Sequence, residues 1–323
     1  MFSSSWFSTQ GNFNNLIGLP LTLFNLNSSH EAGVFELGMS LSGEIARLAQ
    51  ICKPELAAFT NIAPVHLQTM GSIEAVAKAK YELVENLSED GIAVINIDDD
   101  RLRNWIKAIP CRVVTYGIDR DADFRVELPD FSGAGNGRFD INGVNFEIQF
   151  PGKYNIYDAA CAIASACGFG CELASLVEPL HTLKPYHLRS EILRFGRITI
   201  INDCYNANPV SMKSAIEMLM SYPGGGRRIA VLADMLELGR DEITLHEEIG
   251  EFLDRAGVEA LFAFGKLANH YLVKYRGHKE YFDDKRELSI ALQKYIKPED
   301  VVLVKGSRGM ALEEVTDFMM NKR

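Results

Sequence analysis

Residues 198–220 read ITIINDCYNANPVSMKSAIEMLM, and this stretch indicates the fold of the chain. The β-branched run at 198–201 is typical of a buried strand. Met212, Ala215, Ile216 and Leu219 follow at the spacing i, i+3, i+4, i+7, which places them on one face of a helix. A buried strand, a polar turn and an amphipathic helix in succession are typical of a parallel sheet covered by helices.

The same alternation continues on both sides of this stretch. Towards the carboxy terminus we predict strands at 229–232, 260–264 and 301–304 and helices at 245–255, 266–275, 285–295 and 311–320. Towards the amino terminus we predict strands at 34–37, 56–62 and 92–97 and helices at 44–50, 72–87 and 155–167. The short runs at 112–116 and 144–150 are broken by Gly and Asp and predict a small antiparallel addition.

The fold class predicted from this pattern is α/β, with two doubly wound domains. A chain of 323 residues is long for one ordinary core. Lys184 precedes Pro185, and the residue before a proline is disfavoured in a helix, so this dipeptide is a candidate linker. We therefore predict domains at 1–184 and 185–323, and we expect the second to fold alone.

Composition excludes several classes of protein. The net charge of −10 disfavours an electrostatic grip on nucleic acid or an anionic membrane, although it permits an anionic substrate. No apolar run approaches the roughly 20 residues of a membrane helix, and the first residues do not resemble a signal peptide. The six cysteines contain no CxxC pair and are expected to be reduced, which favours a cytoplasmic protein.

Polar residues stand at the ends of two predicted strands in the first half. Glu36 ends the strand at 34–37 and precedes Gly38, where a backbone can approach a ligand closely. Asn61 and His66 follow the strand at 56–62. Ligands bind at the carboxyl ends of parallel strands, and a carboxylate with an imidazole suits a divalent cation. Each residue alone is weak evidence, because an isolated histidine is more often structural.

Lys80 lies on the apolar side of the predicted helix at 72–87, whose N-cap is Ser72, whereas Lys78 points elsewhere. A buried lysine is costly unless it is paired or neutral. Two interpretations stay open: a snorkelling stem or salt bridge, or an amine with a lowered pKa. Such an amine can react with carbon dioxide and form a metal-binding carbamate. The stripe that Lys80 shares comprises Ile73, Val76, Ala77, Leu83, Val84 and Leu87.

Three further clusters are rich in side-chain donors and acceptors. The amides of GNFNN at 11–15 stand in a loop or simple turn. The polar run NDCYNANP at 202–209 suits recognition of a polar ligand or, as the alternative, forms an Asx-rich turn before a helix. KGSR at 305–308 places two cations after the last strand, which suits a carboxylate, a phosphate or a solvated loop.

These motifs resemble, in their order, those of the Mur ligase family, and in particular its MurF-type branch. The resemblance covers nearly the whole chain, and GNFNN together with YNANP at 205–209 is specific for that branch. The other matching motifs are ELGM at 36–39, NIAPVHL at 61–67, AKAKYE at 77–82, LADMLELG at 232–239, His246 and KGSR at 305–308.

The resemblance implies an enzyme of peptidoglycan synthesis that joins D-Ala-D-Ala to the UDP-N-acetylmuramoyl-tripeptide. ATP is expected to phosphorylate the peptide carboxylate, which the dipeptide amine then attacks. Mg²⁺ and protein cations would neutralise the charge on the phosphates.

The resemblance also implies roles for individual residues. Lys80 is expected to be carbamylated and to bind Mg²⁺ together with Glu36 and His66. Arg189 is expected to reach the γ-phosphate and Asp203 to lie near the ribose. Asn155 and Asp158 are the remaining implied ATP-binding residues, and the implied substrate-binding residues are Asn14, Asn15, Asn206, Asn208, Lys305, Ser307 and Arg308.

Two departures from the family pattern stand out. Asp158 occupies the place of an asparagine that is expected to meet adenine, and an ionised carboxylate cannot donate to a ring nitrogen. The family's GxxGKT phosphate loop, expected shortly before GNFNN, is also lacking, since only MFSSSWFSTQ stands there and no GK[ST] occurs in the sequence.

Three hypotheses follow. The first is a partial sequence of a MurF-type ligase, and the second is an inactive or partner-dependent binding chain that retains a dipeptide or nucleotide surface. The third, a ligase similar to folylpolyglutamate synthase, is disfavoured by GNFNN and YNANP. Under the first two, we expect no measurable ligation by these 323 residues alone, and rescue by a segment that carries the phosphate loop.

Overall fold

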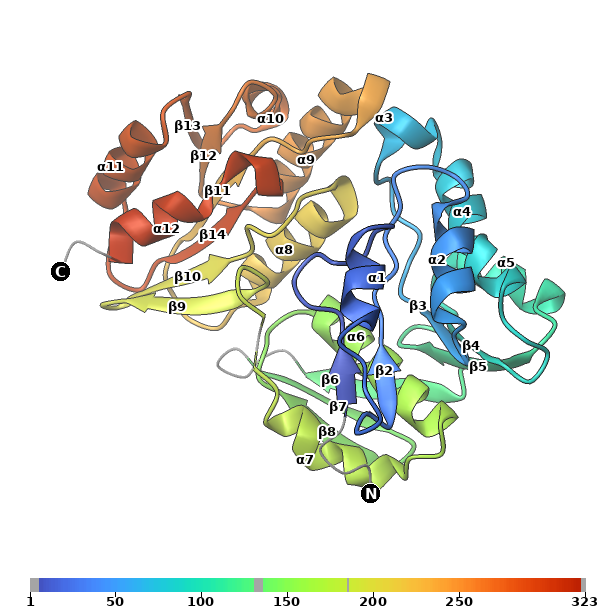
Figure 1. The fold of residues 1–323 in the computed structure, drawn as a ribbon. Coiled ribbons are helices and arrows are strands. Elements are labelled where there is room, and N and C mark those ends of the chain that lie inside the picture. The colour runs from blue at the N-terminus through green and yellow to red at the C-terminus, as the bar shows by residue number, and fades with distance from the viewer. Residues whose placement is uncertain (1–5, 131–135, 185, 321–323) are drawn as a thin grey trace. The chain divides into compact units, whose positions relative to one another are not determined.

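The computed structural model describes residues 6–130, 136–184 and 186–320. They divide between two compact units, the first comprising Met1–Arg125 with Ala160–Leu176 and the second Val126–Ala159 with Val177–Arg323 (Figure 1). Pro185, the predicted linker residue, lies outside the described residues, and the domain boundary after residue 184 stays a prediction. Within the described ranges, no helix is long and apolar enough to cross a membrane.

The first unit alternates strands and helices as expected. Its helices α2, α4 and α5 pack with strands β3 and β4 around one apolar core, which includes Leu48, Val76, Leu102, Phe59 and Ile95. Its elements are β1 (Trp6–Ser8), α1 (Gly18–Leu23), β2 (Ala32–Val34), α2 (Glu44–Cys52), β3 (Leu56–Phe59), α3 (Leu67–Met70), α4 (Ile73–Glu85), β4 (Ile92–Asn96), α5 (Asp100–Trp105), a 3₁₀ turn (Ile106–Ala108) and β5 (Arg112–Gly117).

The sheet of the first unit corrects one prediction. Strand β5 pairs parallel with β4, with Val114 opposite Val94, so the run at 112–116 belongs to the parallel sheet and not to an antiparallel addition. The cause is the helix α5 between β4 and β5, which provides the crossover that parallel strands need. The antiparallel part begins with β6 (Phe124–Asp130). This strand pairs antiparallel with β7 (Gly137–Ile141), which pairs antiparallel with β8 (Val144–Ile148).

Two predicted strands end earlier than expected. Strand β2 stops at Val34, because the amide of Glu36 binds the Thr9 hydroxyl and the amide of Gly38 binds the Asn14 carbonyl instead of a neighbouring strand. Strand β3 stops at Phe59. Glu36 and Asn61 therefore lie on loops just beyond the strand ends.

The carboxy-terminal sheet has the order β13-β12-β11-β14-β10-β9. Its strands are parallel except β9, which pairs antiparallel with β10 at the edge. The strands are β9 (Glu191–Phe195), β10 (Ile198–Asn202), β11 (Arg228–Ala233), β12 (Ala260–Phe264), β13 (His278–Phe282) and β14 (Val301–Lys305). The helices of the second unit are α6 (Lys153–Gly168, which ends in the first unit), α7 (Val177–His181), α8 (Pro209–Ser221), α9 (Glu242–Ala256), α10 (Tyr271–Lys274), α11 (Lys285–Tyr295) and α12 (Glu313–Met320). Its 3₁₀ turns lie at Gly239–Asp241, Ala268–His270 and Arg308–Met310, whereas the 3₁₀ turn at Leu173–Leu176 belongs to the first unit.

Alternate residues of these strands face two separate apolar cores. Ala230 and Leu232 of β11 pack with α8 and α9, whereas Ile229 and Val231 pack with α11 and α12. Figure 1 shows the two helix pairs on opposite faces of the sheet. Burial on both faces explains the continuous apolar runs from which these strands were predicted.

The remaining differences concern short or polar elements. The predicted helix at 266–275 is a 3₁₀ turn (Ala268–His270) followed by α10. Strands β9 and β13 were not predicted, because edge strands need no continuous apolar run and His278–Phe282 is mostly exposed or half-buried.

Candidate active site

The GNFNN loop lies against the segment that carries Glu36. The Asn14 side-chain amide donates to Glu36 Oε1 at 3.0 Å, and the Asn14 carbonyl accepts from the amide of Gly38 at 2.8 Å. A Cβ on Gly38 would stand 2.9 Å from the Asn14 side chain, so glycine is needed for this approach. The structure thus brings together two residues that the sequence placed in separate motifs.

Asn15 has a local structural role. Its side-chain oxygen accepts from the amides of Ile17 and Gly18 at 3.0 and 2.9 Å, at the start of α1. This is the turn interpretation of the loop, and contact of Asn15 with a substrate stays a prediction.

Lys80 is directed inward from α4, as its position on the apolar face predicts. Ser72 caps this helix by accepting from the amide of Ala75 at 3.1 Å. The Lys80 ammonium donates to the Asn61 carbonyl at 2.9 Å, whereas Lys78 is exposed. Burial lowers the pKa of Lys80, and the negative charge of Asp99 acts in the opposite direction. Lys80 therefore combines an inward position with a destabilised cationic form.

Asp99 is a residue that sequence reasoning missed. Its carboxylate accepts from the amide of Ile62 at 2.7 Å and caps α5 through the amides of Arg101 and Leu102. The signal was the acidic run at 98–100, which the sequence analysis had not singled out as part of a site. Through Ile62, Asp99 fixes the loop whose carbonyl holds Lys80.

His66 begins the short helix α3. Its φ of +53° is a left-handed conformation, uncommon for a residue other than glycine. Thr69 of α3 donates its hydroxyl to the Ser40 carbonyl at 2.6 Å and lies 3.1 Å from the His66 carbonyl. The segments that carry Glu36 and His66 are thus joined through one side chain.

By donor type, Glu36 and His66 suit a divalent cation, whereas the unmodified ammonium of Lys80 does not. Across the described parts of the chain, no three His, Cys, Asp and Glu side chains form a metal-binding group. Glu36 and His66 would supply two donors, and an anionic carbamate on Lys80 would supply oxygen as the third.

In the second unit, the buried Lys305 and the half-buried Asp203 form an ion pair at the ends of β14 and β10. The Lys305 ammonium is 2.6 Å from Asp203 Oδ2 and also donates to the Asn206 carbonyl at 2.9 Å. The other Asp203 oxygen accepts from the amide of Ser190 at 3.0 Å. Lys305 is 3% exposed, so its ammonium holds the loop at 202–209 in place. A substrate contact of Lys305 stays a prediction.

The other residues of these two motifs also have internal partners. Asn208 caps α8 in a capping box with Ser211, and Pro209 takes the first helical position. The Ser307 hydroxyl accepts from the amide of Leu236 at 2.9 Å. Asn206 is exposed, and its side-chain oxygen accepts from the amide of Ala207.

Two arginines differ in their availability. Arg308 forms an ion pair with Glu313. Arg189 is exposed, and its guanidinium lies over the ring of Tyr205 at 3.9 Å from the centroid. Stacking leaves the edge of a guanidinium open, which suits a cation expected to meet a phosphate.

Asn155 and Asp158 lie on the first turns of α6. The Asn155 side-chain amide donates to the Pro151 carbonyl at 2.5 Å. Desolvation raises the pKa of Asp158 to about 6, and the charge of Arg189 acts in the opposite direction. Asp158 is nevertheless exposed at the surface of α6, so its carboxylate meets water and acts as an acceptor when ionised.

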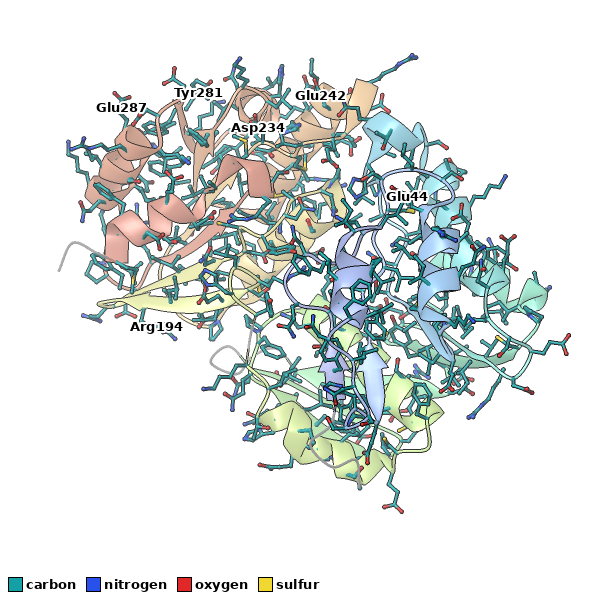
Figure 2. All side chains as sticks on the ribbon, viewed as in Figure 1. Glu44, Arg194, Asp234, Glu242, Tyr281 and Glu287 are labelled. Atoms are coloured by element: carbon teal, nitrogen blue, oxygen red, sulfur yellow. The ribbon has the colours of Figure 1, made fainter. Side chains whose placement is uncertain are left out.

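His246 and Asp234 fix the segment after β11. His246 is buried, accepts from the amide of Met235 at 3.0 Å through Nε2 and lies 2.6 Å from the Glu242 carbonyl through Nδ1, which requires the neutral ring. Burial lowers the pKa of His246. Asp234 accepts from the amide of Ala268 at 2.7 Å, and Figure 2 labels it.

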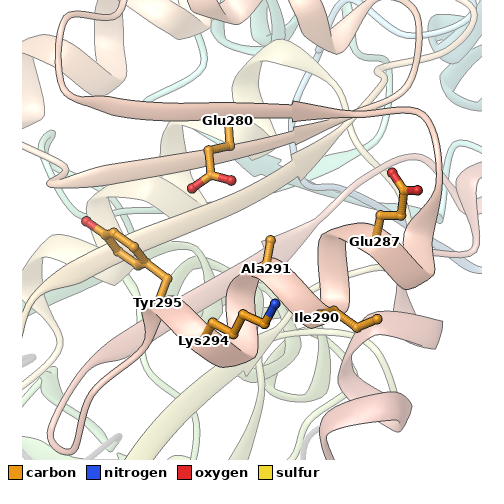
Figure 3. Close-up of a pocket in the computed structure, with 6 residues that line it drawn as sticks. All are labelled: Glu280, Glu287, Ile290, Ala291, Lys294 and Tyr295. Atoms are coloured by element: carbon orange, nitrogen blue, oxygen red, sulfur yellow. The ribbon is translucent and has the colours of Figure 1, made fainter.

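A surface pocket between α11 and β13 contains none of the predicted residues. Figure 3 shows Glu280 of β13 opposite the α11 side chains that line it. The candidate site is therefore identified by motif residues at strand ends and not by this hollow. The lining residues are Glu280, Glu287, Ile290, Ala291, Lys294 and Tyr295.

Comparison with known families assigns both halves of the chain. Residues 2–166 match the family described as Mur ligase middle domain, and residues 188–308 match Mur ligase, glutamate ligase domain. The chain belongs to the Mur ligase family. This membership explains why the strand-end motifs occur in the observed order, and it confirms the resemblance on which their roles were predicted.

Individual Mur ligases support the assignment along the whole chain. UDP-N-acetylmuramoyl-tripeptide–D-alanyl-D-alanine ligases of Bacillus subtilis and Escherichia coli are 38% and 35% identical, over 95% of this chain and 68% and 69% of their own lengths. The MurF structure of Acinetobacter baumannii superposes with a TM-score of 0.92 at 26% identity, over 99% of this chain and 71% of that one. The structure of MurF from Thermotoga maritima in complex with ADP superposes with a TM-score of 0.90 at 26% identity, over 98% of this chain and 73% of that one. The α/β fold with parallel sheets is thereby confirmed.

Proposed function

We propose that this Mur ligase joins D-Ala-D-Ala to the UDP-N-acetylmuramoyl-tripeptide in an ATP- and Mg²⁺-dependent reaction of cytoplasmic peptidoglycan synthesis. The observation that carries the proposal is Lys80, a lysine directed inward whose ammonium donates to the Asn61 carbonyl at 2.9 Å. The named relatives, 38% and 35% identical, support the same reaction and substrates.

Lys80 supplies the chemistry of the metal site. Its lowered pKa favours the neutral amine, which attacks carbon dioxide and loses a proton to give the carbamate. The carbamate, Glu36 and His66 would then hold Mg²⁺, whose charge neutralises that of the phosphates during transfer. Asn14 would orient Glu36 through their 3.0 Å hydrogen bond.

The second unit would supply the nucleotide and dipeptide contacts. Arg189, whose guanidinium lies over the ring of Tyr205, would meet the γ-phosphate, and Asp158 would accept from the adenine amino group. Asp203, fixed by Lys305 and Ser190, would lie near the ribose, and Asn155 would complete the nucleotide site. The dipeptide would contact the ends of β10 and β14, where Asn206, Asn208, Ser307 and Arg308 lie.

The proposal is tested in a fused protein. Residues 1–323 replace the matched 68% of the Bacillus subtilis ligase, and UDP-pentapeptide formation is measured with ATP, Mg²⁺ and D-Ala-D-Ala. We expect product that depends on all three, its loss in Lys80→Met, and its retention in Lys78→Met, which changes the exposed lysine of the same helix. A folded fusion that forms no product, or an active Lys80→Met variant, would refute the proposal.

Exposed apolar side chains favour a second candidate, dependence on a further polypeptide segment. Ile17, Leu21 and Phe24 flank or lie on α1 and are 74%, 48% and 83% exposed. Apolar surface of this kind marks an interaction site. If the dependence is real, residues 1–323 alone form no product, whereas the fusion does. Equal turnover by both proteins would remove this candidate.

A further inference from the structure

Two side chains outside the predicted site connect the three segments that carry Glu36, His66 and Lys80. They are Thr69 of α3 and Glu82 of α4, and all of these residues lie in the first unit. No role was predicted for either residue from the sequence.

Glu82 stands two positions after Lys80 on α4 and reaches the start of α2. Its carboxylate accepts from the Ser42 hydroxyl at 3.1 Å, from the amide of Gly43 at 2.8 Å and from the amide of Ala46 at 3.1 Å. Gly43 is the N-cap of α2, has a φ of +88° and provides no side chain of its own for capping. A carboxylate on free amides at a helix amino terminus is a favourable arrangement.

The segment that Glu82 holds is the one that follows Glu36. Residues 36–43 run from ELGM to the start of α2, and their middle is fixed by a second carboxylate, Glu44, which accepts from the amides of Ser40 and Leu41 (Figure 2 labels Glu44). Glu44 belongs to α2 itself, so it shapes the turn but does not tie it to another helix. Glu82, by contrast, lies on α4, the helix that carries Lys80. Among the contacts of the described residues, its three hydrogen bonds are the ones in which a carboxylate connects this turn to α4.

Thr69 makes the corresponding connection to His66. Its hydroxyl donates to the Ser40 carbonyl at 2.6 Å, and its backbone amide donates to the His66 carbonyl at 3.1 Å. The same turn is thus held from α3 through Ser40 and from α4 through Gly43 and Ala46.

We propose that Glu82 and Thr69 are positioning residues that set the spacing of Glu36, His66 and Lys80 for a divalent cation. This rests on the proposed function, because it takes those three residues as the metal-binding set. Thr69 is exposed and Glu82 half-buried, and both act on an exposed turn, so the loss of either hydrogen-bond set costs the fold little. The cost falls on the geometry of the cation site, where residues that orient ligands contribute about 10-fold or more in affinity.

The test uses Glu82→Gln and Thr69→Val in the 323-residue chain, with Mn²⁺ alone as the probe. Gln keeps the size of Glu82 but removes its charge and one acceptor, and Val keeps the shape of Thr69 without its hydroxyl. Mn²⁺ affinity is measured by electron paramagnetic resonance, the Lys80 carbamate by ¹³C NMR in labelled bicarbonate, and folding by the thermal midpoint. Controls are Thr69→Ser, which keeps the hydroxyl, and Glu85→Gln, which removes an exposed charge from the same helix.

We expect each test variant to bind Mn²⁺ about 10-fold more weakly than the parent, with a weaker carbamate signal and little change in midpoint. Both controls should match the parent. A parent that binds Mn²⁺ and variants that bind it equally would overturn the positioning roles and leave the proposed function intact. A parent with neither Mn²⁺ binding nor carbamate would overturn the metal set itself, and unfolding of both variants would show that the two residues are structural.

Discussion

In each unit of this Mur ligase a lysine near a strand end points inward, and the two lysines differ in the groups that their ammonium contacts. Lys305 is 3% exposed and lies 2.6 Å from the Asp203 carboxylate. Lys80 donates to a neutral carbonyl, that of Asn61, and burial lowers its pKa. Burial alone therefore does not decide the chemistry of a lysine. A carboxylate keeps it a structural cation, whereas a carbonyl leaves an amine that can react.

The largest expected effect concerns the structural lysine. Lys305→Met leaves the half-buried Asp203 without its cation, and we expect this to cost about 3 kcal/mol of unfolding free energy, at the lower end of the range for buried ion pairs. Urea unfolding of the variant measures the loss. Lys279→Met is the matched control, since Lys279 is exposed and donates only to the Leu272 and Tyr275 carbonyls, so its loss should be below about 1.5 kcal/mol. If Lys305→Met and Lys279→Met lost similar amounts of unfolding free energy, the ion pair of Lys305 with Asp203 would have no special structural role.

The reactive lysine should show the opposite pattern. Lys80→Met removes the proposed third metal donor, and we expect the fused enzyme to lose about 100-fold or more in turnover. The unfolding free energy should change little, because an apolar side chain replaces an amine that is costly to bury. Turnover and urea unfolding are measured on the same preparation. If Lys80→Met lost as much unfolding free energy as Lys305→Met and kept its turnover, Lys80 would be the structural lysine and this prediction would be wrong.

A smaller effect is expected from Asp99, a carboxylate that influences Lys80. The charge of Asp99 raises the pKa of Lys80, so Asp99→Asn should lower the pKa of Lys80 further. The neutral amine then persists to lower pH, and carbamylation should extend to lower pH with it. Asparagine can still accept from the amides of Ile62, Arg101 and Leu102. The pH dependence of the ¹³C carbamate signal measures the shift. An unchanged profile would mean that Asp99 acts only through the fold.

The smallest effect concerns a second buried group whose neutral form is favoured, His246. Its folded pKa lies below its unfolded value, so the unfolded chain binds more protons as the pH falls below about 6.5. The stability that His246 contributes is therefore present above that pH and is lost towards lower pH. His246→Gln should flatten this part of the stability profile in urea unfolding at several pH values. A parent whose stability is constant from pH 7 to about 5 would contradict it.

Local elements of both lysine sites could be predicted from sequence. Ser72, the stripe through Val76 and the step of the helix place Lys80 inward, and Asn208 before Pro209 marks the start of α8. These signals act within a few residues, where capping and periodicity dominate.

What could not be predicted depends on long-range pairing. Lys305 and Asp203 are 102 positions apart, and only the parallel pairing of β14 with β10 brings them together. The sequence therefore suggested two cations open to an anion at residues 305–308. Likewise, Thr69 and Glu82 were missed because their partners, Ser40 and Gly43, lie on another loop, and the parallel pairing of β5 could not be distinguished by composition from an antiparallel addition.

The position of β14 has a consequence for how the protein is made. This strand lies between β11 and β10 in the carboxy-terminal sheet, although it is the last strand along the described chain. Until residues 301–305 have left the ribosome, β14 cannot pair with β10 and β11, and Asp203 lacks its ion-pair partner Lys305. This sheet therefore closes only after its other strands have been made, through contacts of high sequence separation, and a nascent chain stalled before Val301 exposes the two strand edges to aggregation and to chaperones.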